Sequence, residues 1–194
     1  MAKGIHTKND IIIRGLDLAS QLGLECITIG LLAKETNLSK SGLFAHFKSK
    51  ENLQIEILNY AAEDFAHKVI RPALKVNAGI ERIKALVNNW INWGSQISGG
   101  CIFVTAGIEY SDRPGKVRNL LIQQQELWID SLCRTAKSAI KAGDFTPDMD
   151  VNQFAFDLYS LLLGFHYFHK LLNDKKINSR QKLALEQLLE KYKS

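Results

Sequence analysis

The sequence predicts an all-α protein of about nine helices. Apolar side chains recur every three to four residues through most of the 194 positions, and no segment shows the strict alternation of a half-buried strand. Only three prolines occur, so few positions would break a helix. The apolar fraction of 46% and the charged fraction of 23% are ordinary for globular proteins, which excludes intrinsic disorder as the main state.

The first predicted helix lies near the N-terminus. Thr7 stands three residues before Asp10, which is the spacing of a capping pair, and apolar residues follow at helical spacing. We expect this helix to stop at Gly23, because glycine accepts the left-handed conformation after a helix without strain.

Two short helices are predicted next, over residues 28–36 and 39–47. Each begins at a hydroxyl residue, Thr28 or Ser39, whose side chain can accept a hydrogen bond from a free amide of the first turn. Asn37 lies between them, and asparagine tolerates the left-handed conformation that a tight turn requires. The pattern therefore predicts two helices joined by a turn.

The predicted helices become longer after this point. Ser49 is expected to cap a fourth helix that ends near Arg71 and Pro72. Five further helices are expected near residues 79–97, 100–111, 115–142, 151–173 and 179–192. This change in helix length predicts a small head over residues 1–50 and a larger helical body over residues 51–194.

The formal net charge is +5, and the head holds more than half of it. Seven basic and four acidic residues occur up to and including Lys50, which gives the head a charge of +3. A moderate positive charge is compatible with nucleic-acid binding and equally with an ordinary basic protein, so the charge alone decides nothing.

Residues 37–53, with the sequence NLSKSGLFAHFKSKENL, have the properties of a recognition helix. Ser39 leaves the amides of the helix start free to face a phosphate, and Lys40 and Ser41 lie in the first turn, where such helices meet base edges. Gly42 permits close approach of the backbone. Three basic side chains at the exit are expected on phosphates: His46, Lys48 and Lys50. Three apolar side chains are spaced to pack inward: Leu38, Leu43 and Phe47.

This part of the sequence, from about residue 11 to 58, resembles the DNA-binding head of the TetR family of transcriptional repressors. The family pattern combines G-x-x-x-T-T/I, an I/L-A pair, S-x-G-x-L/F-Y-x-H-F and K-x-x-L. The corresponding segments here are residues 23–28, 32–33, 39–47 and 50–53. Asn37 replaces the usual turn glycine, and Phe44 replaces a tyrosine whose hydroxyl commonly contacts a phosphate.

The resemblance implies a ligand-responsive transcriptional regulator, most commonly a repressor, that binds a palindromic DNA operator as a homodimer and is released by a small-molecule effector. Residues 1–50 would be the helix-turn-helix DNA-binding domain, and residues 51–194 the ligand-binding and dimerisation domain. The residues that it places at the DNA surface are Thr28, Ser39, Lys40, Ser41, Gly42, Phe44, His46 and Lys50. Among them, Lys40 and Ser41 are the expected base contacts.

The body holds all three tryptophans, and with other aromatic residues they are candidates for an apolar effector cavity. Core packing explains each aromatic residue equally well. Glu109 is a carboxylate in an apolar helix, where it could orient a ligand or be a satisfied surface or interface residue. The candidate lining residues are Trp90, Trp93, Phe103, Glu109, Tyr110, Trp128, Phe156, Tyr159, Phe165 and His166.

The last two predicted helices are candidates for the dimer interface. The helix over 154–172 is apolar nearly all round, and the final helix carries one apolar stripe, so the two could form a four-helix bundle with their two-fold copies. The alternative is that they close the core of a monomer. The candidate interface residues are Phe168, Leu171, Leu172, Leu185, Leu188, Leu189 and Tyr192.

Other functional classes have less support. The sequence contains no phosphate-binding glycine loop, no G-x-S-x-G and no H-E-x-x-H, so we expect neither an enzyme nor a catalytic residue. A helical adaptor, or a small-molecule-binding protein without sequence-specific DNA binding, remains the alternative.

We expect no cofactor and no metal site. His166 and His169 have metal-compatible spacing but lack a third ligand, and three separated cysteines form no C-x-x-C pair. Of these cysteines, Cys101 is expected to be an inert buried thiol rather than an oxidation sensor. No signal peptide and no run of 18 apolar residues occur, so we expect a cytoplasmic protein without membrane association.

Overall fold

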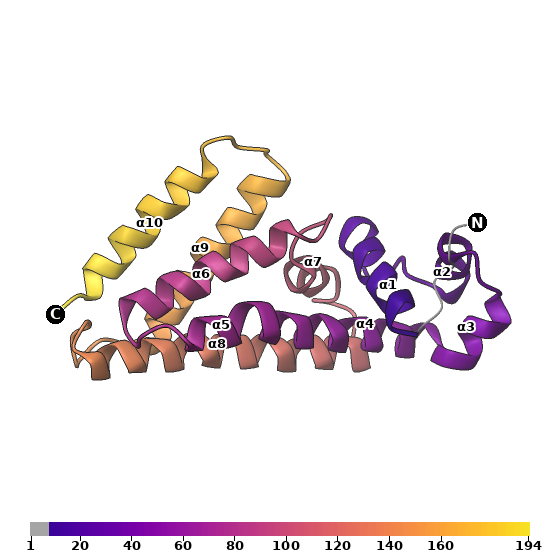
Figure 1. The fold of residues 1–194 in the computed structure, drawn as a ribbon, viewed down its shortest axis with the longest axis horizontal. Helices are drawn as coiled ribbons and strands as arrows, with labels where there is room; N and C mark the ends of the chain where they lie inside the picture. Colours follow the sequence, from indigo (N-terminus) through magenta and orange to yellow (C-terminus); the bar gives the residue numbers. More distant parts are fainter. Residues whose placement is uncertain (1–7) are drawn as a thin grey trace. The chain divides into compact units, whose positions relative to one another are not determined.

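The computed structural model describes residues 8–194, and its regular elements in that range are helices (Figure 1). Their bounds are α1 Lys8–Leu22, α2 Ile29–Thr36, α3 Lys40–Phe47, α4 Lys50–Phe65, a π-helix Ala66–Ile70, α5 Arg71–Leu74, α6 Ile80–Ser95, α7 Ile102–Glu109, α8 Lys116–Ala142, α9 Val151–Lys170 and α10 Ile177–Tyr192. Because α4, the π-helix and α5 follow without a break, residues 8–194 form nine helical segments. The predicted all-α class is confirmed.

The ends of the first three helices follow the local signals in the sequence. Gly23 has φ 91° and donates its amide to the Ala19 carbonyl at 3.0 Å, which ends α1. Thr28 accepts from the Leu31 amide at 3.0 Å and caps α2, and Asn37 takes the left-handed conformation in the turn after it. The predicted N-cap of α1, Thr7, lies outside the described residues.

The fourth helical segment contains a widened turn that the sequence analysis did not predict. The segment continues past Pro72 to Leu74, and Arg71 donates its amide to the carbonyl of Ala66, five residues back. Proline lacks an amide hydrogen and its ring crowds the carbonyl four residues before it, so the π-helix directly before Pro72 accommodates the ring. The Asn89 side chain donates to the Val69 carbonyl within this turn at 3.1 Å.

The chain divides into two compact units, each made of separate stretches of sequence. The first unit combines residues through Asp64 with Ser95–Gln124, and the second combines Phe65–Gly94 with Gln125–Ser194. The first unit therefore contains α1 to α3, nearly all of α4, α7 and the beginning of α8. The division into units describes how the chain packs. The predicted boundary at residue 50, which separates a DNA-binding head from a ligand-binding body, stays a prediction.

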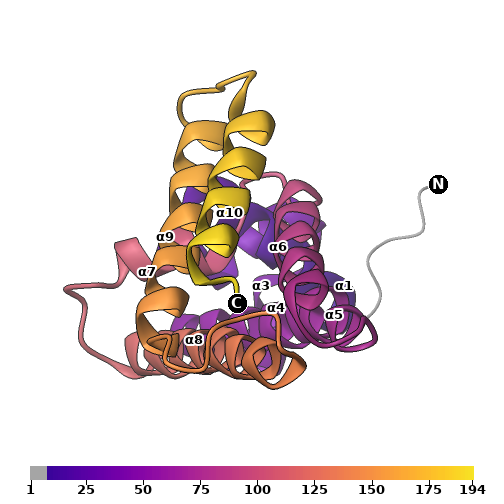
Figure 2. The ribbon, with the colours of Figure 1, turned by 90° about the vertical axis from the view of Figure 1, so that its left-hand side faces the viewer.

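In the second unit, α9 and α10 pack side by side as a hairpin (Figure 2). Phe154 of α9 lies 5.2 Å from Phe145 and 5.5 Å from Tyr192 of α10, measured between ring centroids, and all three are buried. Such edge-on aromatic contacts add to the apolar burial that joins the two helices. None of the helices within residues 8–194 has the length and apolar character needed to cross a bilayer.

Candidate nucleic-acid interface

Helix α3 has one buried side and one exposed side. Leu43 and Phe47 are each only 1% exposed, as predicted, and they fix α3 against the rest of the first unit. Phe44 is 56% exposed, so an aromatic ring stands on the outer side without apolar cover. The predicted DNA-facing residues that are exposed on α3 and its ends are Ser39, Lys40, Ser41, Gly42, Phe44, His46 and Lys48.

The beginning of α3 is organised by its cap. Ser39 Oγ accepts from the Gly42 amide at 3.1 Å and lies 3.3 Å from Ser41 Oγ. The Lys40 side chain extends over α2, because a Cβ added at Gly30 would lie 3.6 Å from its Cε and 3.8 Å from its Nζ. Its ammonium group is therefore near the beginning of α2, where the helix dipole and free amides favour an anion.

The two lysines after α3 have different surroundings. Lys48 is exposed and has φ 62°, the conformation that ends α3. Lys50 is half-buried, and its Nζ lies 2.5 Å from Glu25 Oε1. Lys48 has no such carboxylate partner among the ion pairs of residues 8–194, whereas the Lys50 side chain, still 38% exposed, is paired with Glu25.

Glu25 is the centre of a polar cluster within the first unit. Tyr110 Oη donates to Glu25 Oε2 at 2.7 Å, and an Arg113 nitrogen lies 3.8 Å from Glu25 Oε1. The hydrogen bonds from Lys50 and Tyr110 hold the pKa of Glu25 below its usual value. Burial, together with the Glu25 charge, raises the pKa of Tyr110. Glu25 is thus ionised and Tyr110 is a neutral donor.

The Glu109 carboxylate accepts hydrogen bonds from the connection between α1 and α2. Its two carboxylate oxygens accept from the amides of Leu24 at 2.7 Å and Glu25 at 3.1 Å. The positive φ of the turn favours glycine at residue 23, and a Cβ there would lie 2.8 Å from Glu109 Oε1, so a larger residue would displace this carboxylate. The sequence marked Glu109 as an unusual carboxylate but gave no sign of a partner 85 residues away.

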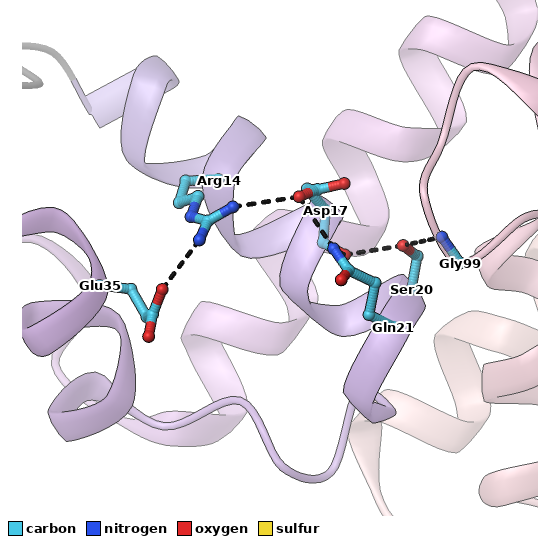
Figure 3. A network of polar contacts seen from close by, with 6 residues as sticks. All are labelled: Arg14, Asp17, Ser20, Gln21, Glu35 and Gly99. Atoms are coloured by element: carbon cyan, nitrogen blue, oxygen red, sulfur yellow. Dashed lines mark hydrogen bonds and ion pairs between the residues drawn. The ribbon is translucent and has the colours of Figure 1, made fainter.

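A second contact joins α1 to the segment before α7 (Figure 3). The Gly99 amide donates to Ser20 Oγ at 2.9 Å, and Ser20 Oγ also donates to the Asp17 carbonyl at 2.7 Å. On the other side of Asp17, Arg14 donates to its carboxylate at 3.1 Å and to Glu35 of α2 at 2.8 Å. Helix α1 is therefore tied by hydrogen bonds both to α2 and to the α6–α7 connection.

The ten candidate effector residues do not form one set. Phe103, Glu109 and Tyr110 belong to the first unit, and the other seven belong to the second. Phe156 is 67% exposed, which places it on the surface of its unit. The other candidates in the second unit that are buried are Trp90, Trp93, Trp128 and Phe165; Tyr159 and His166 are half-buried.

Aromatic rings cluster in the second unit. Trp93 and Trp128 each meet Phe65 edge-on, with ring centroids 5.1 and 5.0 Å apart, and Tyr159 lies 6.5 Å from Trp128. The buried indole nitrogen of Trp128 has no hydrogen-bond acceptor among residues 8–194. Burial, followed by the nearby Lys170 and His169, lowers the pKa of His166. An unpaired buried donor carries a desolvation cost that an oxygen acceptor would remove.

The candidate dimer residues also separate into two groups. Phe168, Leu171 and Leu172 are 40%, 66% and 52% exposed. In contrast, four residues of α10 are buried in the chain's own core: Leu185, Leu188, Leu189 and Tyr192. Their apolar stripe faces the core of its own chain, where Tyr192 packs on Phe154. These four side chains are therefore not available to a second copy of the protein.

Cys101 follows the expectation of an inert buried thiol. Cys101 is buried, and burial raises its pKa to about 11. Burial also raises the pKa of Cys133, whereas Cys26 is exposed.

Two family models together match most of the chain. The model for bacterial regulatory proteins of the tetR family matches residues 11–57, which include the capped helices α2 and α3. The model for the tetracyclin repressor-like C-terminal domain matches residues 79–185, more than half of the sequence. The chain belongs to the TetR family. It is a transcriptional regulator with a DNA-binding helix-turn-helix, in a family of regulators rather than enzymes.

Solved structures of other regulators share this fold over nearly the whole chain. A TetR-family transcriptional regulator from Cytophaga hutchinsonii is 23% identical, with 97% of this chain and 98% of that chain covered and a TM-score of 0.85. The regulator CifR, solved as a cysteine mutant with 26-bp double-strand operator DNA, is 18% identical, with 99% and 100% covered and a TM-score of 0.81. AibR, solved with isovaleryl coenzyme A and operator DNA, is 20% identical, with 94% and 97% covered and a TM-score of 0.68. A comparison with curated proteins gives no match.

Proposed function

We propose that this TetR-family regulator is a repressor that binds a palindromic operator as a homodimer and is released by a small-molecule effector. The observation that carries the proposal is the exposed face of α3, which is fixed from behind by Leu43 and Phe47. A helix held in this way can enter a major groove without losing packing. AibR and CifR, which share the fold, are solved with operator DNA.

The proposed contacts follow from the chemistry of that face. Lys40 and Ser41 are the candidates for base edges, and Lys48 and His46 for phosphates. Phe44 has no hydroxyl for a phosphate, but its ring suits the methyl group of a thymine. Thr28 and Ser39 lie at helix starts whose free amides favour phosphates, and Gly42 leaves room for the backbone to approach.

A homodimer is proposed because one short helix reads too few base pairs for specific binding. Helix α9 and its C-cap residue support it with exposed apolar residues spaced along one helical face: Phe156, Leu163 and Tyr167 of α9, and Leu171 directly after it. A Cβ at Gly164, beside this face, would meet no atom of the chain within 4 Å, which leaves room for a second helix to approach closely. The proposed interface therefore uses α9 and the residues after it, with Phe168 and Leu172, rather than the buried stripe of α10.

The proposed effector binds near the aromatic cluster of the second unit. The unpaired Trp128 indole N–H supports this region and favours an effector that carries a carbonyl or carboxylate oxygen beside an apolar body. Binding releases DNA only through a difference in effector affinity between the DNA-bound and free conformations.

The decisive experiment is selection of duplexes from a random pool, followed by footprinting of the enriched sequence and of the DNA upstream of the gene. We expect an inverted repeat and an affinity that falls steeply with salt. Equal affinity for the enriched and random duplexes at low salt would overturn the proposal and favour a helical adaptor or ligand carrier.

Effector binding is tested separately by a thermal-shift screen of carboxylates and acyl thioesters. Trp128→Phe keeps an aromatic ring in the cluster and removes only the indole donor, so it should weaken binding of an oxygen-bearing hit. A hit that leaves operator affinity unchanged would contradict release by an effector.

A further inference from the structure

Lys50 differs from the other basic residues near the recognition helix. Lys40 and Lys48 are exposed, whereas Lys50 is half-buried and paired with Glu25 at 2.5 Å. It also lines an open pocket of about 600 Å³ with Glu25, Tyr110 and residues 112–118, which comprise the end of the α7–α8 connection and the beginning of α8. Its ammonium group thus lies against Glu25 at the rim of this pocket, with the side chain still 38% exposed.

The Lys50–Glu25 pair joins the two ends of the helix-turn-helix. Glu25 precedes the N-cap of α2, Thr28, by three residues, and Lys50 follows the last residue of α3, Phe47, by three residues. The ion pair therefore closes residues 25–50 into a loop that contains both helices. A bond at the base of such a loop restricts the angle at which α3 leaves the unit.

Glu25 makes further hydrogen bonds besides its ion pair with Lys50. Tyr110, directly after α7, donates to its second carboxylate oxygen at 2.7 Å, and the Glu25 amide donates to Glu109 at 3.1 Å. Gln54 of α4 adds a bond to the neighbouring Leu24 carbonyl at 2.9 Å. The base of the loop is thus bonded to both α4 and the end of α7.

The pairing also reduces the value of Lys50 as a phosphate contact. Affinity for DNA gains from each cation that replaces condensed counterions on a phosphate. Lys50 and the ionised Glu25 are together neutral, and a phosphate would have to compete with Glu25 for the Lys50 ammonium at the cost of the 2.5 Å bond. An exposed lysine such as Lys48 carries no such cost.

On these grounds we propose that Lys50 is a positioning residue of the helix-turn-helix, which acts through Glu25 and Tyr110 to fix the recognition helix, rather than a phosphate contact. The inference rests on the proposed DNA binding and assigns Lys50 a role different from the one implied by the family resemblance.

The test compares Lys50→Gln and Glu25→Gln with the matched control Lys48→Gln. Binding to a random-sequence 26-bp duplex is measured by fluorescence anisotropy at several salt concentrations. We expect Lys48→Gln to reduce the slope of log K against log salt by about 0.9 for each lost phosphate contact. Lys50→Gln should leave the slope at the wild-type value. A slope reduced equally by Lys50→Gln and Lys48→Gln would overturn the proposal.

A second measurement uses the sequence enriched by selection. Lys50→Gln and Glu25→Gln should each lower the preference for the enriched over the random duplex. The double variant should lower it by less than the product of the two factors, because both single variants break the same ion pair. If the wild type shows no preference, the proposed function fails; if the wild type shows one and Lys50→Gln retains it in full, the positioning role fails.

Hydrogen exchange of the DNA-free protein tests the same role without any DNA. Lys50→Gln and Glu25→Gln should speed amide exchange in residues 24–28 and 40–47 and leave α10 unchanged, while Lys48→Gln should not. Unchanged exchange in both segments would contradict a positioning role.

Discussion

The backbone of Gly99 lies directly against Ser20: its amide donates to Ser20 Oγ at 2.9 Å, and a Cβ at residue 99 would lie 1.7 Å from the Ser20 carbonyl oxygen (Figure 3). No side chain fits at that distance, and the obstacle is backbone rather than a movable side chain. The α6–α7 connection is therefore bound to α1 by a contact that only glycine permits.

Gly99→Ala should lower the free energy of unfolding by about 1–3 kcal/mol, the usual cost of overpacking a close contact. Chemical denaturation measures it. Gly30→Ala is the matched control, because a Cβ there would meet its nearest atoms at 3.6 Å or more and should cost nothing. Equal stability of the two variants would show that the contact relaxes easily.

The acid side of the stability profile should depend on Glu25. Its pKa is lowered in the folded protein by the bonds from Lys50 and Tyr110. The stabilisation is therefore complete above the ordinary carboxyl pKa of about 4.3 and is lost as pH falls through the lower folded value. Glu25→Gln should flatten the fall in stability below about pH 4.5, and Tyr110→Phe should flatten it in part. Parallel profiles for wild type and Glu25→Gln would rule this out.

Two leucines of α10 should differ sharply on truncation. Leu185 is 6% exposed and Leu183 is 56% exposed. Leu185→Ala removes packed methyl groups and should cost about 2–5 kcal/mol of unfolding free energy, whereas Leu183→Ala should cost much less. Urea unfolding at two protein concentrations separates this loss from any effect on association. Similar losses for both variants would mean that Leu185 is not in the core.

The proposed dimer face should be sensitive to charge. Leu171→Glu places a carboxylate on the exposed end of that face and should shift the protein from dimer to monomer, as measured by light scattering across micromolar concentrations. Leu74→Glu is the control, since Leu74 is also exposed, at 54%, but lies outside the face. Loss of the dimer in both variants, or in neither, would count against the α9 interface.

The cysteines should react at very different rates with a thiol reagent at pH 8. Cys26 is exposed and should react first, while the buried Cys101, with a pKa of about 11, has almost no thiolate. Cys26→Ser should therefore remove the rapid phase, and Cys133→Ser should leave it intact. A rapid phase that survives Cys26→Ser would show that a buried thiol is accessible.

Local signals in the sequence were sufficient for the helices and their ends. Thr28, Ser39 and Asn37 act through bonds to residues within a few positions, so their roles can be inferred without the fold. The inward packing of Leu43 and Phe47 follows from helical spacing for the same reason. The π-helix before Pro72 was missed because a proline in the sequence indicates a break, and a widened turn is a rarer solution.

Most features that could not be predicted from the sequence depend on contacts between residues that are far apart in the chain. Glu109 was noticed as an isolated carboxylate, but the amides of Leu24 and Glu25 that it binds are recognisable only after folding. The apolar stripe of α10 has the same spacing whether it faces its own protomer or a second copy, so periodicity could not separate Leu185 from Leu171. Likewise, the position of Lys50 after the recognition helix predicted a phosphate contact, because its pairing with Glu25 is visible only in the folded chain.

The first unit consists of two separate stretches of sequence, and this affects how DNA-binding heads can be exchanged between related regulators. A chimera cut just after the recognition helix would take only α1 to α3 from this protein. In this protein such a cut would separate Leu24 and Glu25 from the Glu109 carboxylate, and Ser20 from Gly99. The transferable part is discontinuous: residues 95–124 have to accompany residues up to 64 if a chimera is to keep the recognition helix in its native setting.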